Sequence, residues 1–289
     1  MAETVALLAN PRAGRGRAAR LAGPVRAALA AQGLDVLVLA GESGRESVEL
    51  TAQAATQGVA AVVAVGGDGL VHCAVQALAG TDVPLGIVPA GGGNDLAGVL
   101  GLPTDPAAAV AVIARGRTRR IDLGRTAGGV WWAGVLNAGF DSAVVARAER
   151  SRIRGRLRYD LATWLELARL RPTPMRIVLD GRPMERAVTL VAVGNSTRYG
   201  GGMLITPGAL LDDGVFHVTV GEAMTRRQLA ALKPLVRAGR HVHSPRVTVH
   251  EAREVTLESP GVPAYADGEP IGPLPVTTTC VPGALRVLT

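Results

Sequence analysis

Cysteine, lysine and aromatic residues are scarce in this chain of 289 residues. Its two cysteines, Cys73 and Cys280, form no CxxC pair, which excludes a disulfide framework and a cysteine zinc site and favours a reducing compartment. Aromatic residues make up 3% of the chain, too few for a surface that stacks nucleic-acid bases. No uncharged apolar run is long enough to span a membrane, and the N-terminus lacks the pattern of a signal peptide. We therefore expect a cytoplasmic globular protein.

Lysine occurs once, at Lys233, so the formal net charge of +7 comes almost entirely from arginine. Arginine favours bidentate contacts with phosphate. Nucleic acid, anionic lipid headgroups and phosphorylated small molecules would all suit this charge. Because base-stacking residues are few, we expect no nucleic-acid partner.

The length and the hydrophobic fraction of 48% exclude a disordered chain and favour two domains. Residues 1–125 alternate short apolar runs with helical patterns, and the run 59–65 is continuously apolar, as in a strand buried on both faces. This alternation predicts an α/β domain with a parallel sheet. The expected strands are 4–9, 35–39, 59–65 and 84–88. The expected helices are 17–32, 43–56 (with Ser43 as N-cap), a helix that follows Gly69 and runs through Ala79, and 96–100.

Residues 126–282 have a different texture, with many short strands separated by turn pairs such as Asp180-Gly181 and Asp213-Gly214. This pattern predicts a mostly antiparallel β-sandwich or barrel. The expected strands are 130–137, 175–179, 188–193, 215–220, 247–250, 255–257 and 276–281, and helices are expected at 159–170 and 225–236.

The strongest local signal is the run 64–70, AVGGDGL, directly after the buried strand. Its glycines, Gly66, Gly67 and Gly69, allow a sharp turn and a close approach to a bound oxyanion at a helix start. Asp68 lies at the carboxyl end of a parallel strand, where such sheets bind ligands. The alternative is an ordinary turn in which Asp68 caps the helix.

A second glycine-rich loop occupies the run 84–103, PLGIVPAGGGNDLAGVLGLP. Gly91, Gly92 and Gly93 suit close approach to a ligand, and Asn94 and Asp95 follow them at the same predicted edge of the sheet. In isolation Asn94 and Asp95 could be helix caps, but two such loops on one sheet favour a binding site.

The opening run 9–18, ANPRAGRGRA, is again strand, glycine-containing loop and helix, with Arg12, Arg15 and Arg17 suited to phosphate. It matches neither the Walker pattern nor the full dinucleotide fingerprint. A P-loop NTPase is therefore excluded, and a nicotinamide site is poorly supported.

These motifs together resemble the diacylglycerol kinase catalytic family, which includes bacterial diacylglycerol and YegS-type lipid kinases and the related sphingosine and ceramide kinases. The resemblance continues through RRIDLG (119–124), LNAGFDSAVV (136–145), GNSTRYGGGMLITPGALLDDGVFHV (194–218), YADGEP (265–270) and PGALRVL (282–288). It therefore covers essentially the whole chain, in order.

The resemblance implies a lipid kinase with two domains. Residues 1–125 would form an α/β nucleotide-binding domain similar to phosphofructokinase and NAD kinase, to which a final strand at 283–289 returns. Residues 126–282 would form a β-sandwich for the lipid, with the active site in the cleft between the domains. ATP and Mg²⁺ would be the cofactors, and diacylglycerol or a related glycerolipid would be the acceptor.

The family's functional positions transfer to this chain by motif. Nucleotide contacts fall on Asn10, Gly66, Gly67, Asp68, Gly69, Gly91, Gly92, Gly93 and Asn94. The acidic trio that organises magnesium falls on Asp68, Asp95 and Asp122, and a structural metal loop falls on Asp213 with the carbonyls of Leu210 and Val215.

The resemblance places the proposed base at Glu269, and Asp68 and Glu269 would then be the catalytic pair. The chemistry agrees, because a lipid hydroxyl is a poor nucleophile until a carboxylate accepts its proton. Without the resemblance, Asp267-Gly268 before Glu269 would indicate only an ordinary hairpin turn.

Two positions depart from the family's usual motifs, GGDGT and PxGTGND, because Leu70 and Gly92 stand in place of threonines. Two alternatives to a lipid kinase follow. One is an NAD kinase-like small-molecule kinase, which shares GGDG but has a different second loop. The other is a nucleotide- or lipid-binding protein with weakened catalysis.

A dense basic run precedes the predicted helix at 159–170, which carries Trp164. It suits the surface of an anionic membrane, although a solvated helix would look similar. We expect a peripheral protein at the inner face of the membrane, and homodimerisation is open. The histidines show no metal-ligand spacing and are expected to be structural or on the surface.

The basic run before the predicted helix at 159–170 comprises Arg147, Arg150, Arg152, Arg154, Arg156 and Arg158.

Overall fold

The computed structural model describes residues 3–10, 17–153, 155 and 157–289, with the side chains of Arg17 and Ala19 left aside. By its internal contacts the chain divides into two compact units. Unit 1 comprises Met1–Leu123, Trp131–Ala133 and Val281–Thr289, and unit 2 comprises Gly124–Val130 and Gly134–Cys280.

Unit 1 is built on a parallel sheet with the order β2-β1-β3-β4-β17. Every residue of β3 is buried, as expected for its run of valine and alanine between two helical layers. The strands are β1 (Thr4–Ala9), β2 (Asp35–Ala40), β3 (Ala61–Gly66), β4 (Leu85–Pro89) and the C-terminal part of β17 (Val276–Leu288).

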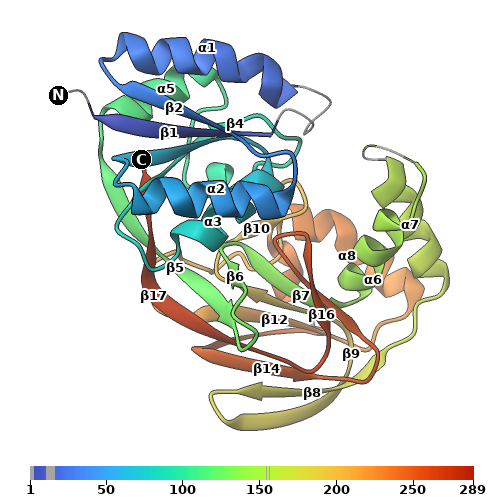
Figure 1. Cartoon of the computed structure of the whole chain (residues 1–289). Coiled ribbons are helices and arrows are strands. Elements are labelled where there is room, and N and C mark those ends of the chain that lie inside the picture. Colours follow the sequence, from blue (N-terminus) through green and yellow to red (C-terminus); the bar gives the residue numbers. More distant parts are fainter. Residues whose placement is uncertain (1–2, 11–16, 154, 156) are drawn as a thin grey trace. The chain divides into compact units, whose positions relative to one another are not determined.

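Helices cover both faces of this sheet (Figure 1). Val25 and Leu29 of α1 pack with Val110 and Ile113 of α5 in the main apolar cluster of the unit, while α2 and α3 contact each other on the other face. Ser43 caps α2 as predicted, since its Oγ accepts a hydrogen bond from the amide of Glu46. The helices are α1 (Arg17–Ala31), α2 (Gly44–Thr56), α3 (Asp68–Leu78), α4 (Asp95–Val99) and α5 (Pro106–Ala114).

Unit 2 is mostly antiparallel, with strands in the order β16-β15-β7-β9-β8-β14-β17. The first half of β9 pairs with β8, while its second half lies between β7 and β12. The strands are β7 (Val135–Gly139), β8 (Thr173–Leu179), β9 (Arg182–Gly194), β10 (Arg198–Tyr199), β11 (Met203–Leu204), β12 (Phe216–Glu222), β13 (Val247–Ala252), β14 (Glu254–Glu258), β15 (Pro263–Ala266) and β16 (Glu269–Pro273).

Helical segments of unit 2 lie between these strands in sequence: α6 (Phe140–Glu149), α7 (Leu157–Ala168), α8 (Arg226–Arg237) and the short 3₁₀ helix η2 (Arg240–His243). No helix in the described part of the chain is long and apolar enough to cross a membrane.

The predicted fold class, an α/β parallel-sheet half and a β-sandwich half, is confirmed. Several elements differ from the sequence prediction, which did not include strands such as β15 and β16. The expected strand at 130–137 is broken into β6 (Trp131–Trp132) and β7, and α5 and α6 had not been anticipated as helices. In α6 the cause is local, because Gly139 at φ 99° ends β7 and turns the chain directly into the helix. Strand β5 (Thr118–Thr126) runs from unit 1 into unit 2.

Candidate active site

The two glycine-rich loops of unit 1 meet at the carboxyl ends of β3 and β4. The amide of Ala90 donates to the carbonyl of Gly66, which extends the pairing of these parallel strands into the loops. A Cβ at Gly67 would lie 2.9 Å from the Cα of Gly91, so a larger residue at Gly67 would force the loops apart. The sequence prediction that both loops share one edge of the sheet is therefore matched by this contact.

Asp68 joins the two loops through both of its carboxylate oxygens. Its Oδ2 accepts a hydrogen bond of 2.8 Å from the amide of Asn94, and its Oδ1 accepts one of 2.6 Å from the amide of Asp95. These bonds go to the second loop, not to the first turn of α3, and no side chain caps α3. The alternative in which Asp68 is a simple helix cap is thus wrong.

The electrostatics of Asp68 favour a cation beside it. Burial raises the pKa of Asp68, and the nearby negative charge of Asp95 raises this pKa further, while the amide hydrogen bonds lower it. Two carboxylates placed together in a partly buried position are the arrangement that a bound cation stabilises.

Asn94 fixes the shape of the second loop. It adopts a left-handed backbone with φ 55°, which asparagine tolerates better than most residues. Its Oδ1 accepts from the amide of Gly91 at 2.9 Å, and its Nδ2 donates to the carbonyl of Gly91 at 3.0 Å. The side chain of Asn94 therefore braces the loop itself.

The three consecutive glycines of this loop are not equivalent. A Cβ at Gly93 would lie 2.5 Å from Oδ2 of Asp68, and one at Gly91 would collide with the Cα of Gly67. A Cβ at Gly92 would meet nothing within 4 Å. Close packing thus requires glycine at Gly91 and Gly93, whereas Gly92 faces open space.

Leu70, one of the two departures from the family motif, is turned into the core. Its side chain is 7% exposed, and a Cβ at Gly66 would lie 2.7 Å from its Cδ2. Leu70 therefore packs against the end of β3. Gly69, between Asp68 and Leu70, is exposed at the start of α3.

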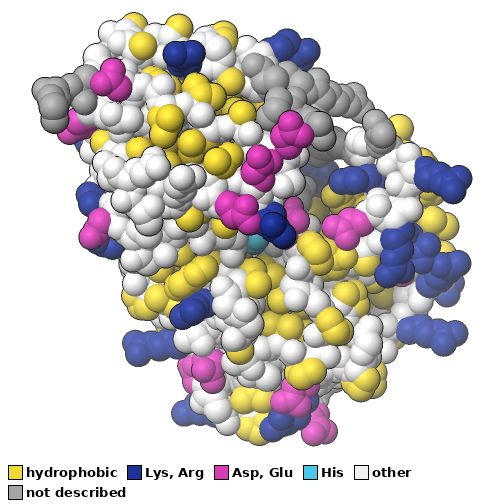
Figure 2. Space-filling view, in the orientation of Figure 1, with side chains coloured by type: hydrophobic (Ala, Val, Ile, Leu, Met, Phe, Trp, Pro, Cys, Tyr) yellow, Lys and Arg dark blue, Asp and Glu magenta, His cyan; other side chains and the backbone are white. Residues whose placement is uncertain are grey.

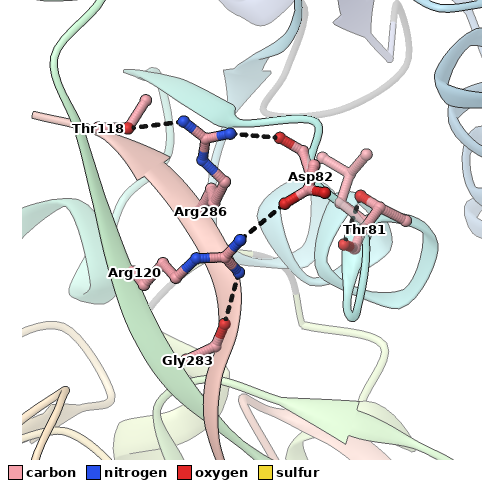
Figure 3. Close-up of polar contacts among 7 residues, drawn as sticks. Thr81, Asp82, Thr118, Arg120, Gly283 and Arg286 are labelled. Atoms are coloured by element: carbon pink, nitrogen blue, oxygen red, sulfur yellow. Dashed lines mark hydrogen bonds and ion pairs between the residues drawn. The ribbon is translucent and has the colours of Figure 1, made fainter.

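Asp122 of β5 has a partner at the C-terminal strand. Its carboxylate is 3% exposed, and its Oδ1 accepts a hydrogen bond of 2.7 Å from the amide of Gly283 in β17. Arg120, on the same strand, donates to the carbonyl of Gly283 and pairs with Asp82 (Figure 3). Asp122 thus lies in a network that attaches the last strand to β5.

Magnesium bound with a nucleotide usually takes one or two carboxylates, while phosphates and water supply the other ligands. Asp68 and Asp95 fit that requirement. Within the described ranges, no three His, Cys, Asp or Glu side chains gather into a group that could hold a metal ion without such help. The structure therefore joins Asp68 to Asp95, while Oδ1 of Asp122 accepts a hydrogen bond from the amide of Gly283.

The opening loop is only partly described. Asn10 is half-buried directly after β1, at the carboxyl end of that strand. Arg12, Arg15 and the side chain of Arg17, which the sequence suggested for phosphate, lie outside the described residues.

In unit 2, Glu269 follows a tight turn between β15 and β16. Asp267 and Gly268 have φ values of 54° and 83°, as in the two-residue hairpin expected from the Asp-Gly pair. Asp267 fixes this turn to β7, because its amide donates to the carbonyl of Val135 and its Oδ1 accepts from the amide of Gly134. Glu269 itself is exposed, so its carboxylate lies on a braced turn and faces solvent.

The strand before this turn is anchored to α6. The hydroxyl of Tyr265 donates to Oε2 of Glu149 at 2.8 Å, and burial, followed by this carboxylate partner, raises the pKa of Tyr265 to about 12. Tyr265 pairs with Asn137 of β7, whereas Glu269 pairs with Ala266, the next residue along β15. Because side chains alternate along a strand, Glu269 and Tyr265 lie on opposite faces.

A partly buried pair in unit 2 was missed by the sequence analysis. Asp141, in the first turn of α6, accepts a hydrogen bond of 2.7 Å from the hydroxyl of Tyr199. Burial raises the pKa of Asp141, and the bond from Tyr199 lowers it. The sequence signal was the acidic residue in LNAGFDSAVV, but nothing local in the sequence indicates a partner 58 residues away.

The predicted metal loop folds on itself. The amide of Val215 donates to Oδ1 of Asp213 at 3.2 Å, and Oδ2 of Asp213 lies 3.6 Å from Nε2 of His217. The side chain of Leu210 is 58% exposed. Asp213 therefore shapes this turn, and the metal assignment of Asp213, Leu210 and Val215 stays a prediction.

Comparison with known proteins identifies the family of the chain. Residues 4–126 match the family described as diacylglycerol kinase catalytic domain, and residues 134–289 match the YegS C-terminal NAD kinase beta sandwich-like domain. A "Diacylglycerol kinase" from Mycobacterium tuberculosis (strain ATCC 25618 / H37Rv) is 44% identical over 291 residues, covering 98% of this chain and 94% of that protein. A "Probable lipid kinase YegS-like" protein from Stenotrophomonas maltophilia is 29% identical, covering 67% of this chain and 65% of its own length.

Solved structures show the same fold. The crystal structure of a diacylglycerol kinase from Bacillus anthracis str. Sterne superposes with a TM-score of 0.73 at 20% identity, covering 99% of this chain and 96% of that one. A second crystal structure from that organism gives a TM-score of 0.80 at 24% identity, covering 99% and 97%. With both domain families matched in order and a full-length relative at 44% identity, the chain belongs to the family of diacylglycerol kinases and YegS-like lipid kinases.

Proposed function

We propose that this protein transfers the γ-phosphate of ATP to a hydroxyl group of a lipid, with diacylglycerol or a related glycerolipid as acceptor. The observation that carries the proposal is Asp68, which ties two glycine-rich loops together at the carboxyl ends of β3 and β4 in a chain of the lipid kinase family.

Unit 1 would bind the nucleotide. The loops at Gly66–Gly69 and Gly91–Asn94 have little side-chain bulk, so the phosphates could approach the backbone closely. Gly92 faces open space on this surface. Asn10, at the end of the neighbouring β1, would complete the nucleotide side of the site.

Asp68 and Asp95 would hold Mg²⁺, which neutralises charge on the transferring phosphate when it is bound. Asp68 also fixes the second loop through two amides, so its removal would affect both the cation and the loop. Asp122 would support this region through Gly283.

Glu269 in unit 2 would be the general base. Its exposed carboxylate, on a turn fixed by Asp267, could accept the proton of a lipid hydroxyl as the oxygen attacks the γ-phosphate. Because the substrate lies in a bilayer, the protein would act peripherally at the cytoplasmic face of the membrane. A homodimer is a further expectation, to be checked by light scattering.

Transfer of labelled γ-phosphate from ATP to a lipid panel in mixed micelles with magnesium tests the proposal. The panel would hold diacylglycerol, phosphatidylglycerol, a sphingoid base and undecaprenol, with NAD as a water-soluble acceptor. We expect a labelled lipid, a loss of labelling in Asp68→Asn, and a decrease of about 10²–10⁴-fold in Glu269→Gln.

Glu258→Gln is a matched control, because Glu258 is a partly exposed carboxylate of unit 2 that pairs with Arg176, and it should retain wild-type labelling. Labelling of NAD alone would replace the lipid kinase with a small-molecule kinase. ATP binding without any transfer would instead favour a binding protein, the reading suggested by Leu70 and Gly92.

A further inference from the structure

Helix α7 carries an exposed apolar stripe. The side chains of Leu157, Leu161, Trp164 and Leu165 are 71%, 44%, 64% and 39% exposed. Leu161, Trp164 and Leu165 follow Leu157 by four, seven and eight residues. This spacing places the four side chains on one face of the helix, within an arc of about 100°. Six of the ten large hydrophobic side chains that are exposed in the described residues lie at 153–165, so this exposure is concentrated at one place on the surface.

The opposite side of α7 already has its partner. Ala162 is 1% exposed and packs with Val144 and Ala148 of α6. Arg147 of α6 also forms an ion pair with Glu166 of α7. Helix α7 is therefore docked through its small residues and directs its largest apolar side chains outward, which is the reverse of an ordinary surface helix.

Arginines surround the stripe, and Figure 2 shows Lys and Arg side chains gathered over this part of unit 2. Among the acidic side chains near the stripe, Glu166 is paired with Arg147, and Glu149 at the end of α6 binds Tyr265. Asp160 within α7 is exposed. The exposed or half-exposed arginines before, within and after the helix are Arg150, Arg152, Arg158, Arg169 and Arg171. Arg154 and Arg156 lie outside the described residues.

This combination selects an anionic lipid surface over a second copy of the chain. In a twofold interface the same patch meets itself, so the arginine rims would face each other and repel. An anionic bilayer offers apolar chains to the stripe and negative headgroups to the rim, as amphipathic helices at membrane interfaces require.

We propose that the α7 stripe (Leu157, Leu161, Trp164 and Leu165) inserts into the interface of an anionic bilayer, while the arginine rim binds its headgroups. This docking surface rests on the proposed function in one respect, since it would bring the kinase to a substrate that resides in the membrane. The docking itself requires neither ATP nor catalysis.

Flotation of the full chain with vesicles tests the docking directly. We expect binding to an equal mixture of phosphatidylcholine and phosphatidylglycerol, little binding to phosphatidylcholine alone, and weaker binding as salt is raised. Replacing Leu161 and Trp164 together by serine should lower the partition coefficient about tenfold or more. Arg152→Gln with Arg169→Gln should lower it on the mixed vesicles only.

A double variant elsewhere supplies the matched control. Leu37 and Val38 of β2 are 40% and 44% exposed, so Leu37→Ser with Val38→Ser likewise replaces two exposed apolar side chains, in unit 1, and should leave vesicle binding unchanged. Circular dichroism checks that each variant is folded. Equal binding by the stripe variant and the wild type, or equal binding of the wild type to both kinds of vesicle, would overturn the proposal.

A second readout separates docking from catalysis. With a short-chain diacylglycerol dispersed in water, the stripe variant should phosphorylate as fast as the wild type, but with long-chain diacylglycerol in vesicles it should be slower by the same factor as its binding. If no lipid is phosphorylated at all, vesicle flotation still decides the docking. A wild-type dimer that the stripe variant converts to a monomer, with vesicle binding unchanged, would assign the stripe to a second copy instead.

Discussion

At the scale of single residues, glycine and carboxylate positions decide the candidate site. Gly67, Gly91 and Gly93 are glycines because the two loops and the Asp68 carboxylate leave no room for a Cβ. Gly92 has room, and the family's usual threonine at this position would extend into open space. In this loop, close packing therefore restricts Gly91 and Gly93 to glycine, whereas it would allow a larger side chain at Gly92.

This difference predicts opposite outcomes for neighbouring substitutions. Gly92→Thr should leave the free energy of unfolding nearly unchanged and should strengthen ATP binding, because the added hydroxyl can reach a phosphate. Gly93→Ala should weaken ATP binding and cost about 1–3 kcal/mol of stability, because its Cβ would overlap the Asp68 carboxylate. Isothermal titration with ATP and urea unfolding measure both effects. Similar results for the two variants would contradict this account of the loop.

Another residue-scale prediction concerns His241, which is 2% exposed. Its Nε2 lies 3.0 Å from the carbonyl of Ile205, and because a carbonyl only accepts, Nε2 carries the proton of the neutral ring. Burial lowers the pKa of His241. The hydrogen bond to Ile205 raises this pKa, and the charge of nearby His243 lowers it. The unfolded chain therefore binds a proton more readily than the folded chain, and stability falls as the pH drops below about 6.5 towards this lower pKa.

We expect the melting temperature of the wild type to fall more steeply between pH 7 and pH 5 than that of His241→Gln, whose amide can still donate to Ile205. His250→Gln is the control, since His250 is partly exposed, with its Nε2 3.2 Å from Oγ1 of Thr248, and this variant should keep the wild-type slope. Differential scanning fluorimetry measures these melting temperatures. Parallel slopes for the wild type and His241→Gln would rule out His241 as the source of the loss of stability at low pH.

At the scale of elements, side chains of β5 and β17 join these two paired strands to each other and to Asp82. Asp122 of β5 accepts from the amide of Gly283, and Arg120 donates to the carbonyl of the same residue. Arg286 of β17 bonds to Thr118 and to the carbonyl of Asp82 (Figure 3). The ion pair of Arg120 with Asp82 is exposed and contributes at most about 1 kcal/mol, so the buried bond of Asp122 is the stronger element of this network.

Two substitutions of Asp122 separate a structural role from a metal role. Asp122→Ala should lower the free energy of unfolding by about 1–3 kcal/mol, because the partly buried amide of Gly283 loses its acceptor. Asp122→Asn keeps an acceptor oxygen and should be much less destabilised in urea unfolding. If Asp122 also assists Mg²⁺, Asp122→Asn should shift the magnesium dependence of ATP binding. Equal destabilisation by both variants would refute the bond to Gly283 as the main contribution of this side chain.

At the scale of the whole molecule, the last residues of the chain complete unit 1. Leu285, Val287 and Leu288 are nearly or fully buried, and Val287 pairs with Leu85 of β4. Leu288 belongs to the same apolar cluster as Leu7 of the first strand. The first unit therefore needs residues from both ends of the sequence.

Removal of Val281–Thr289 should consequently unfold unit 1. Three buried side chains contribute about 1.5–3 kcal/mol each, which together approaches the total stability of a typical domain. We expect the truncated chain to lose helical circular dichroism and to be cleaved rapidly by trypsin within residues 17–123. Removal of Thr289 alone, which leaves those side chains in place, is the control. A truncated chain that melts like the wild type would show that β17 is dispensable.

The sequence by itself determined the local features of this protein. Apolar runs predicted β1, β3 and β4, and glycine with Asp or Asn at the strand ends predicted where the loops would bind a ligand, because strand burial and turn geometry depend on neighbouring residues. The motif order indicated the lipid kinase family, which the comparisons confirmed. Helix α6 was missed because its start depends on one glycine at the end of a strand.

Only the tertiary structure decided which of those residues meet. Asp68 reaches amides 26 and 27 residues away, and Asp122 reaches one 161 residues away, distances in sequence that no local pattern encodes. The exposure of Trp164 was equally unreadable, because the same helical spacing suits a buried face and only the packing of Ala162 on α6 shows which face is turned out. The order of strands and the docking of helices bring distant residues together, and these depend on the whole chain folding at once.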